Sequence, residues 1–244
     1  MNRVLKKMES AVWELGKRRV VIECPASLGA SIEQIQGFPP LRSWLQKLHA
    51  DIEVRRVTIQ SVDTFKSGSI GFVKLSSDAH FNGTRIPGVV FLRGPSTAVL
   101  LILRTQEGGR VPSRLDGGYA VMVEQPRVAA GEALLELPAG MDDGVCTAVK
   151  EVMEETGVAI EEGDLVELGA AYPSPGACDE MVTLYACEKA VTSDELERVR
   201  GRLGGCRSEG ELITVRLVRI SDLWQTTDMK TLAALYLWDR RKLI

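Results

Sequence analysis

The stretch from Leu137 to Val158, LPAGMDDGVCTAVKEVMEETGV, constrains the fold more than any other part of the chain. On a helix, its aliphatic side chains recur at intervals of three and four residues, which is typical of a stripe facing a core. The stripe consists of Val145, Ala148, Val149 and Val152. Asp142 or Asp143 can cap the start, and Gly157 can end the helix in the left-handed conformation. The stretch therefore predicts a helix with one buried face.

Three glutamates follow the edge of that stripe. At about 100° per residue, Glu151, Glu154 and Glu155 share one flank of the helix. Like charges at this spacing repel by roughly a few tenths of a kcal/mol per pair, so stability alone does not favour them beside a buried face. Mg²⁺ would remove the repulsion, because it prefers hard oxygen ligands and leaves positions open for phosphates. A solvated acidic face is the alternative, but it leaves the preceding Pro-Ala-Gly turn unexplained. We therefore expect a metal site.

The same stretch resembles the sequence box of the Nudix hydrolases, G-x5-E-x7-R-E-U-x-E-E-x-G-U, in which U is aliphatic. The matching residues are Gly140, Glu151, Val152, Glu154, Glu155, Gly157 and Val158. Lys150 stands where the box has Arg, which keeps the positive charge but not the planar fork. The segment is also four residues shorter than the box, and the first Glu of the box has no counterpart. Asp142 and Asp143 are the nearest acids.

Sequences outside the box narrow the resemblance. They read RIPGVVFLRGPSTAVLLIL, YAVMVEQPRVAAGEALLELPAGM, YPSPGACDEM and EGELITVRLV. These segments look like the Nudix enzymes that hydrolyse ADP-ribose and other nucleoside diphosphate sugars, especially the plant-type ADP-sugar diphosphatases. The resemblance covers most of the chain from Ile52 to Leu237. It implies an enzyme that cleaves the diphosphate bond to give a nucleoside monophosphate and a sugar phosphate.

The resemblance also implies a metal site. In the matching positions, Glu151, Glu155 and the backbone carbonyl of Ala139 would hold Mg²⁺, or Mn²⁺ in its place. Glu154 would share or support this site.

Further residues are implied for proton transfer and substrate binding. The catalytic base of the group lies on a late loop, where either Glu209 or Glu211 could deprotonate water, and the sequence does not choose between them. Arg127 matches a residue that contacts the phosphates or the terminal sugar, and arginine suits bidentate phosphate contacts. Met141 and Glu180 match positions near the substrate. A surface ion pair for Arg127 and a solvent-exposed Glu180 are the competing interpretations.

The remaining pattern predicts an α/β protein. Period-two alternation and short continuous apolar runs are typical of strands, and they occur at 54–62, 70–75, 86–92, 98–103, 119–124, 134–137, 165–171, 181–187 and 213–218. Asn82-Gly83 predicts a tight turn. A last helix is expected over 228–243, with Leu232, Leu235 and Tyr236 facing the core. Strands on both sides of one acidic helix, closed by a second helix, predict a Nudix α/β/α sandwich with a mixed sheet.

Arg93-Gly94-Pro95 interrupts the pattern, and we place the domain boundary there, between residues 1–92 and 93–244. The first domain is expected to hold an N-terminal helix, a short amphipathic helix near 41–48 and an antiparallel sheet. The basic N-terminus could instead be a targeting peptide, but Glu9 and Glu14 disfavour that interpretation. In the enzymes that the chain resembles, this domain is exchanged across a homodimer and helps to build the substrate pocket.

Composition argues against several classes of protein. A net charge of −3 and a pI of about 5.6 give no electrostatic case for binding nucleic acid or an anionic membrane. No apolar run reaches the roughly 18 residues of a membrane helix. Five scattered cysteines indicate free thiols in a reducing compartment, so we expect a cytoplasmic protein, with organelle import as the alternative. With two histidines only, carboxylates must carry proton transfer.

Three functions compete. The first is a metal-dependent nucleoside diphosphate sugar pyrophosphatase, which the three box glutamates favour. The second is a weakened Nudix domain that binds nucleotide sugars without hydrolysing them, which Lys150 and the shortened box favour. The third is an RNA-processing hydrolase, which the acidic pI disfavours. We expect the first.

Overall fold

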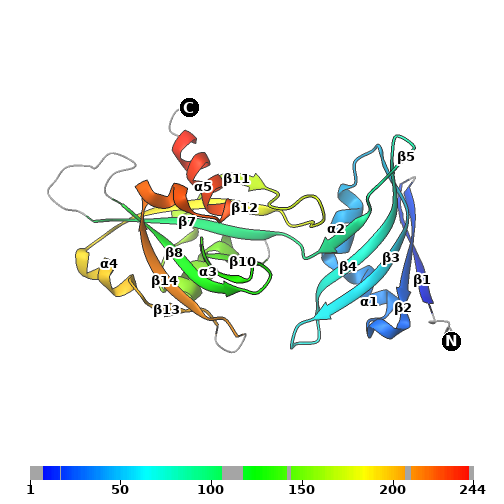
Figure 1. Ribbon diagram of the computed structural model, residues 1–244, viewed down its shortest axis with the longest axis horizontal. Helices are drawn as coiled ribbons and strands as arrows, with labels where there is room; N and C mark the ends of the chain where they lie inside the picture. The colour runs from blue at the N-terminus through cyan, green and yellow to red at the C-terminus, as the bar shows by residue number, and fades with distance from the viewer. Residues whose placement is uncertain (1–7, 17, 106–117, 142–143, 207–209, 242–244) are drawn as a thin grey trace. The chain divides into compact units, whose positions relative to one another are not determined.

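The computed structural model describes residues 8–16, 18–105, 118–141, 144–206 and 210–241 (Figure 1). The chain divides into two compact units, each of which is described here by itself. The first comprises Met1–Gly94 and Ser174–Glu180, and the second comprises Pro95–Pro173 and Met181–Ile244. The cut after Gly94 lies two residues beyond the expected boundary, and the return of Ser174–Glu180 to the first unit has no counterpart in the sequence analysis.

A mixed sheet and short helices form the first unit. In the order in which the strands pair, the sheet contains β1 (Met8–Leu15), β2 (Arg18–Pro25), β3 (Ile52–Thr64), β4 (Ile70–Phe81) and β5 (Thr84–Ile86), and β6 (Val89–Leu92) also pairs with β4. The helices are η1 (Ala26–Leu28), α1 (Ile32–Gly37) and α2 (Pro39–Lys47). The expected antiparallel pairing holds for β1–β2, β3–β4, β4–β5 and β4–β6, whereas β2 and β3 pair in parallel. The turn at Asn82-Gly83 is confirmed, with φ angles of 49° and 79°.

The expected N-terminal helix is wrong. Residues 8–15 and 18–25 instead form an antiparallel hairpin, β1 and β2. In β2 every second side chain, Val20, Ile22 and Cys24, is fully buried. This alternation of buried side chains, two of them β-branched, suits a pleated, half-buried strand better than a helix.

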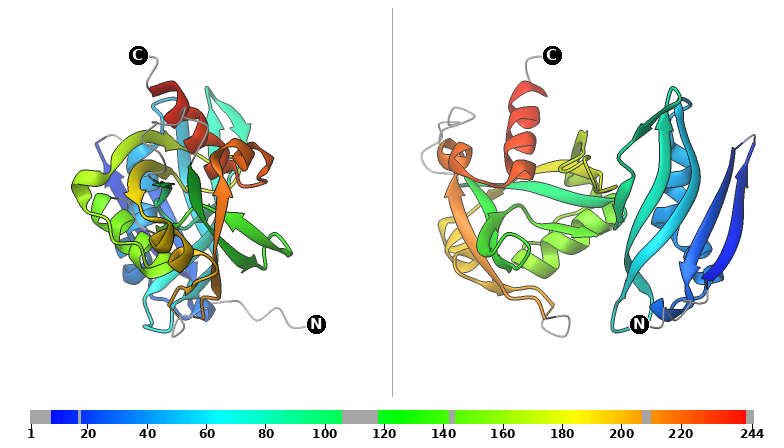
Figure 2. Two further views of the ribbon diagram at one scale, coloured as in Figure 1. Left: turned by 90° about the vertical axis from the view of Figure 1, so that its left-hand side faces the viewer. Right: turned by 45° about the vertical axis from the view of Figure 1, so that its right-hand side comes forward.

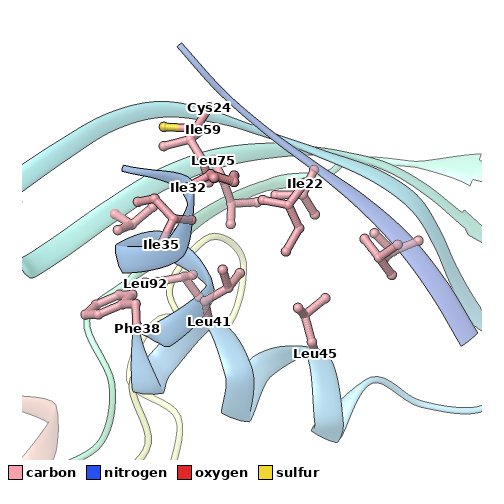
Figure 3. Close-up of a cluster of buried hydrophobic side chains, with 14 of the residues drawn as sticks. Ile22, Cys24, Ile32, Ile35, Phe38, Leu41, Leu45, Ile59, Leu75 and Leu92 are labelled. Carbon is pink, nitrogen blue, oxygen red and sulfur yellow. The ribbon is translucent and has the colours of Figure 1, made fainter. Parts of the chain in front are cut away.

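Helices α1 and α2 cover one face of this sheet and close its core (Figure 3). A capping box between Ser31 and Gln34 starts α1, and Pro39 stands in the first turn of α2, where its missing N–H costs nothing. The core includes Ile22, Cys24, Ile59 and Leu75 from the sheet and Ile35, Phe38, Leu41 and Leu45 from the helical layer. The helix expected near 41–48 is thus confirmed as α2.

The segment Ser174–Glu180 completes the first unit through backbone contacts. Phe91 N–H donates to the carbonyl of Ala177 at 2.7 Å, which extends the edge of β6. The carboxylate of Asp179 accepts the N–H of Arg93 at 2.7 Å. Residues separated by more than 80 positions therefore stabilise the end of the first unit's sheet.

A second mixed sheet forms the centre of the second unit. Its strands, in spatial order, are β11 (Val166–Ala171), β12 (Val182–Val191), β7 (Ser96–Thr105), β8 (Tyr119–Arg127), β14 (Ile213–Arg219) and β13 (Leu203–Gly204). Two short strands extend it, β10 (Ala139–Met141) beside β7 and β9 (Glu132–Glu136) beside β8. Strands β7 and β12 pair in parallel, while the other pairs in the described part of this unit are antiparallel.

Helices cover both faces of this sheet (Figures 1 and 2). They are α3 (Val145–Thr156), α4 (Ser193–Val199) and α5 (Met229–Arg240), with short 3₁₀ turns η2 (Glu162–Asp164) and η4 (Ile220–Gln225). Alternate side chains of β7 enter two separate cores. Leu100 packs in the layer of Trp238 from α5, and Leu101 packs in the layer of Ala148 and Val152 from α3. The predicted α/β/α sandwich is confirmed. Within the described ranges, no helix has the length and apolar character needed to cross a membrane.

Candidate active site

Helix α3 places its three glutamates at different depths. Val152 is fully buried against the sheet, and Glu155 lies one turn later on the same side with 3% of its surface exposed. Glu151 is half-buried and Glu154 is exposed. Gly157 ends the helix with a φ of 72°, as the sequence predicts. The expected caps, Asp142 and Asp143, lie outside the described residues, and the N-cap position is held by Gly144, which offers no side chain.

The carboxylate of Glu155 is held by the backbone of β10. Its Oε2 accepts the N–H of Ala139 at 3.1 Å. That amide is fixed because β10 pairs with β7 and because Val99 N–H donates to the carbonyl of Pro138 at 3.0 Å. The prediction for Ala139 concerned its carbonyl, but the contact that the structure shows is made by its amide.

The pKa of Glu155 is raised to about 8. Burial is the largest cause, and the neighbouring carboxylates of Glu151 and Glu211 raise this pKa further, while the Ala139 amide and the positive charge of Arg127 lower it. Burial disfavours the charged form of a carboxyl group, and nearby negative charges add to that effect. Negative charge therefore accumulates around the buried carboxylate of Glu155, and the three carboxylates of Glu151, Glu155 and Glu211 are named here the acidic cluster.

Gly140 allows Glu151 to lie against β10. A Cβ atom at this glycine would stand 2.0 Å from Oε1 of Glu151 and 2.2 Å from its Cδ. Any side chain there would displace the glutamate. The glycine of the box pattern therefore has a steric role here, because Gly140 leaves room for the Glu151 side chain of α3 beside β10.

Glu211 reaches the acidic cluster from the loop before β14. Its Oε2 accepts the N–H of Cys206 at 2.7 Å. The same loop is anchored to α3, because Gly205 N–H donates to the carbonyl of Glu154 at 3.1 Å. Of the two candidate bases, Glu209 lies outside the described residues. Glu211 is the one that the structure places beside the box helix.

Glu154 faces solvent. Its Oε2 lies 3.6 Å from Nζ of Lys150, one turn earlier on α3, and both side chains are largely exposed. Such a pair contributes at most about 1 kcal/mol to stability. The side chain of Glu154 therefore lies in a surface ion pair, apart from the buried carboxylate of Glu155.

Arg127 belongs to a group of four charged side chains, named here the buried charge network, with Glu136, Asp228 and Lys230. Arg127 makes a bidentate contact with Glu136, through Nε at 2.6 Å and Nη2 at 3.3 Å. Lys230 Nζ lies 2.9 Å from Glu136 and 2.8 Å from Asp228. Of these four residues, only Arg127 was predicted from the sequence to bind substrate. The other three come from β9 and the start of α5, and no motif signalled them apart from Asp228, a good helix cap.

Mutual pairing keeps this network charged. Burial opposes ionisation of Glu136, but the hydrogen bonds and charges of Arg127 and Lys230 lower its pKa below the ordinary value. Burial likewise opposes the charge on Lys230, but Asp228 and Glu136 together raise its pKa. Glu155 contributes to the raised pKa of Arg127, so the network and the acidic cluster act on each other.

Comparison with known proteins identifies the family. No protein-family model matches the sequence. Over 224 residues the chain is 37% identical to Nudix hydrolase 14, chloroplastic, of Arabidopsis thaliana, which covers 81% of this chain and 69% of that protein. The chain is a Nudix hydrolase. The family predicted from the box, and with it an enzyme, is confirmed.

Two further similarities are weaker. An ADP-ribose pyrophosphatase of Bacillus subtilis (strain 168) is 30% identical over 111 residues, which span 44% of this Nudix hydrolase and 55% of that protein. A solved structure described as an ADP compounds hydrolase is 17% identical and has a TM-score of 0.47, covering 77% of this chain and 95% of that one.

The two remaining predicted substrate residues lie in different units. Met141 is half-buried in β10, opposite Ser96 of β7, and so belongs to the same strand as Ala139. Glu180 belongs to the first unit, where its Oε1 lies 3.0 Å from Nη1 of Arg93. Its side chain therefore takes part in an ion pair of that unit.

The acidic cluster fits a divalent cation in a Nudix hydrolase. Within the described ranges, no three His, Cys, Asp or Glu side chains form a ready-made ligand set. Mg²⁺ does not need one, because it is commonly bound by one or two carboxylates together with waters and substrate phosphates. Burial and the neighbouring carboxylates disfavour the charged form of Glu155 and raise its pKa, and a bound cation would oppose both effects. The oxygen donors of Glu151 and Glu155 match the hard ligands that Mg²⁺ prefers.

Proposed function

We propose that this Nudix hydrolase cleaves the diphosphate bond of nucleoside diphosphate sugars of the ADP-ribose, ADP-glucose or UDP-glucose type. The products would be a nucleoside monophosphate and a sugar phosphate. The acidic cluster beside Arg127 carries this proposal, because a diphosphate needs both a cation site and a guanidinium that can bind its oxygens. The similarity to a protein named ADP-ribose pyrophosphatase supports the substrate class.

In this proposal Glu151 and Glu155, with the carbonyl of Ala139, hold Mg²⁺, and Mn²⁺ could replace it. Glu154 supports the site from the exposed side of α3. When bound, the cation neutralises phosphate charge and lowers the pKa of water. The protein supplies a rigid frame, since the strand that carries Ala139 is paired with β7 and abuts both Glu151 and Glu155.

Glu211 is our candidate for the proton acceptor. The amide of Cys206 holds its Oε2, while Oε1 has no hydrogen bond within the described part of the chain. A carboxylate held at one oxygen keeps its direction and can accept a proton at the other. Glu209 remains a candidate from the same loop.

Arg127 is our candidate for phosphate binding. Its Nε and Nη2 contact Glu136, its Nη1 has no protein partner among the residues described, and 42% of its side chain is exposed. A guanidinium fixed on one edge can donate from the other edge to a phosphate oxygen. Met141 and Glu180 remain proposed substrate contacts.

We also propose a homodimer formed through the first unit. Strand β1 lies at the edge of its sheet, and Met8, Val12 and Leu15 on it are exposed apolar side chains. Unpaired edges of this kind favour pairing with another chain. The molar mass in solution, from light scattering, tests the dimer.

All five cysteines are free, which supports a reducing compartment such as the cytoplasm.

The first experiment measures phosphate release with an added phosphatase on ADP-ribose, ADP-glucose, UDP-glucose and diadenosine polyphosphates, with and without Mg²⁺. Turnover of a nucleotide sugar that requires metal is the expected result. Glu211→Gln should lower kcat by about a hundredfold or more, whereas Glu167→Gln, an exposed glutamate of β11, should not.

Two outcomes would contradict the proposal. Binding of nucleotide sugars without turnover, for example by calorimetry, would make the protein a binding module, in line with the Lys150 change in the box. Hydrolysis confined to diadenosine polyphosphates would assign another substrate class. Full activity of Glu211→Gln would transfer the role of base to Glu209.

A further inference from the structure

Glu136 is the centre of the buried charge network. Only 5% of its side chain is exposed, and both of its oxygens are in use. Oε1 accepts from Nε of Arg127 at 2.6 Å, and Oε2 accepts from Nζ of Lys230 at 2.9 Å. The carboxylate therefore cannot turn without losing one of two charged partners.

Lys230 connects this carboxylate to the start of α5. Its ammonium also contacts Oδ1 of Asp228 at 2.8 Å. The other oxygen of Asp228 accepts from the backbone and the hydroxyl of Thr231, at 3.2 and 2.8 Å, and caps the helix. Oδ2 also lies 3.4 Å from the amide nitrogen of Leu137, the residue after Glu136. Lys230 is thus held between a helix cap and a strand end.

Stability alone does not account for this arrangement. Four charges sum to zero here, but the desolvation of buried ion pairs often equals or exceeds their attraction, and apolar side chains of similar size can replace them without loss. The ion pairs instead fix the orientations of the Glu136 carboxylate and the Arg127 guanidinium. Exposure falls steeply through the network, from 42% for Arg127 to 19% for Lys230 and 6% for Asp228. Only the guanidinium is open on one side.

We propose that Lys230 is a positioning residue for substrate binding, because it holds Glu136 in the orientation that directs the free edge of Arg127 toward the phosphates. The inference rests on the proposed function, in which Arg127 contacts the diphosphate. Lys230 does not touch the substrate itself. Its ammonium acts as a buried point charge that binds Oε2 of Glu136 at 2.9 Å, while Arg127 binds Oε1 at 2.6 Å and the same Oε2 at the longer distance of 3.3 Å.

The first test compares Lys230→Met with the wild type in hydrolysis of ADP-ribose at saturating Mg²⁺. Without Lys230, the bidentate Arg127–Glu136 pair loses its charged anchor at the start of α5 and can turn as a unit, so that the guanidinium loses its fixed direction. We expect KM to rise about tenfold while kcat changes by less than about twofold, the signature of lost uniform binding. A matched control is Lys189→Met, which removes a lysine that donates to the carbonyl of Ala159 on the same unit and should leave KM unchanged.

A double-mutant cycle separates positioning from a structural role. If Lys230 acts through Arg127, then Lys230→Met should change KM by less than about twofold in an Arg127→Met background. An equal rise of KM in both backgrounds would overturn the inference. So would a fall of kcat at unchanged KM.

A second readout needs no substrate. The Nε–Hε resonance of Arg127, identified by its loss in Arg127→Met, should shift in Lys230→Met and stay in place in Lys189→Met. An unshifted resonance overturns the positioning role, whereas absence of wild-type hydrolysis overturns only the proposed function. If Lys230→Met does not fold, Asp228→Asn, which keeps a cap acceptor, should shift the same resonance.

Discussion

The buried carboxylate of Glu155 accepts a hydrogen bond from the backbone amide of Ala139 at 3.1 Å. Among the described residues, this uncharged amide is the hydrogen-bond donor to the Glu155 carboxylate. One amide does not balance burial together with the negative charges of Glu151 and Glu211, which is why the pKa of Glu155 rises to about 8. The protein therefore carries an acid that is half-protonated near that pH unless a cation is present.

The stability of the metal-free protein should fall as pH rises. Because the pKa of Glu155 is 4.5 ordinarily and about 8 in the fold, the unfolded chain loses its proton first. The contribution of Glu155 to the free energy of unfolding is therefore lowest above about pH 8. There it is lower than at acidic pH by on the order of a few kcal/mol. Thermal denaturation in EDTA, from about pH 5 to about pH 9, measures this. Glu155→Gln should lack this part of the pH dependence, and identical profiles would contradict the prediction.

Glu155→Gln should also remove most of the activity. The amide keeps the size of the side chain and cannot supply the negative oxygen that a cation requires, so we expect kcat to fall by about a hundredfold or more. Circular dichroism should show an intact fold. Glu167→Gln serves as the control, and near-normal turnover of Glu155→Gln would remove this residue from the site.

Gly140→Ala should inactivate the enzyme by displacing Glu151. The added methyl group would stand 2.0 Å from Oε1 of Glu151, closer than any real contact, so the glutamate or strand β10 must move. A loss of about a hundredfold in kcat/KM is expected, measured at several Mg²⁺ concentrations. Gly163→Ala is the matched control, because a Cβ there meets no atom within 4 Å. Equal activity of the two variants would contradict the steric argument.

Lys150→Arg should raise kcat or leave it unchanged. The lysine forms an exposed contact with Glu154 at 3.6 Å, and an arginine has the length and planar fork to improve this contact. Lys150→Met should change the free energy of unfolding by less than about 1 kcal/mol in urea titrations. A large loss of activity in Lys150→Arg would show that the shortened box has built a different local geometry.

Periodicity predicted the sandwich and the box helix well. Ala148 and Val152 repeat with the helix period and are buried, and Gly157 adopts the left-handed conformation that ends α3. The doubly buried strand β7 was equally visible as a continuous apolar run. These features depend on residues close in sequence, where spacing and direction are coupled.

Other features depend on contacts that spacing does not encode. On α5, Leu232 and Tyr236 were expected to face the core but are exposed, while Thr231, Ala234 and Trp238 are buried. The buried face of α5 includes Thr231, whose hydroxyl donates to the capping carboxylate of Asp228, and a polar residue of this kind does not appear in an apolar pattern.

The buried charge network shows the same limit. Glu136 and Lys230 are 94 positions apart, and the pairing that joins them depends on how α5 sits beside β9. Arg127 was singled out through a resemblance, but its bidentate partner was not. Long-range pairs of this kind follow from the tertiary arrangement and leave no periodic trace in the sequence.

The segment Ser174–Glu180 determines whether the first unit can be separated from the rest of the chain as one continuous fragment. The chain passes between the two units at three places, after residues 94, 173 and 180. A single cut after residue 94 therefore leaves the first unit incomplete, because Phe91 and Asp179 would lose the partners that complete the first sheet. The two units are compact in space, but neither of them is one continuous stretch of the sequence.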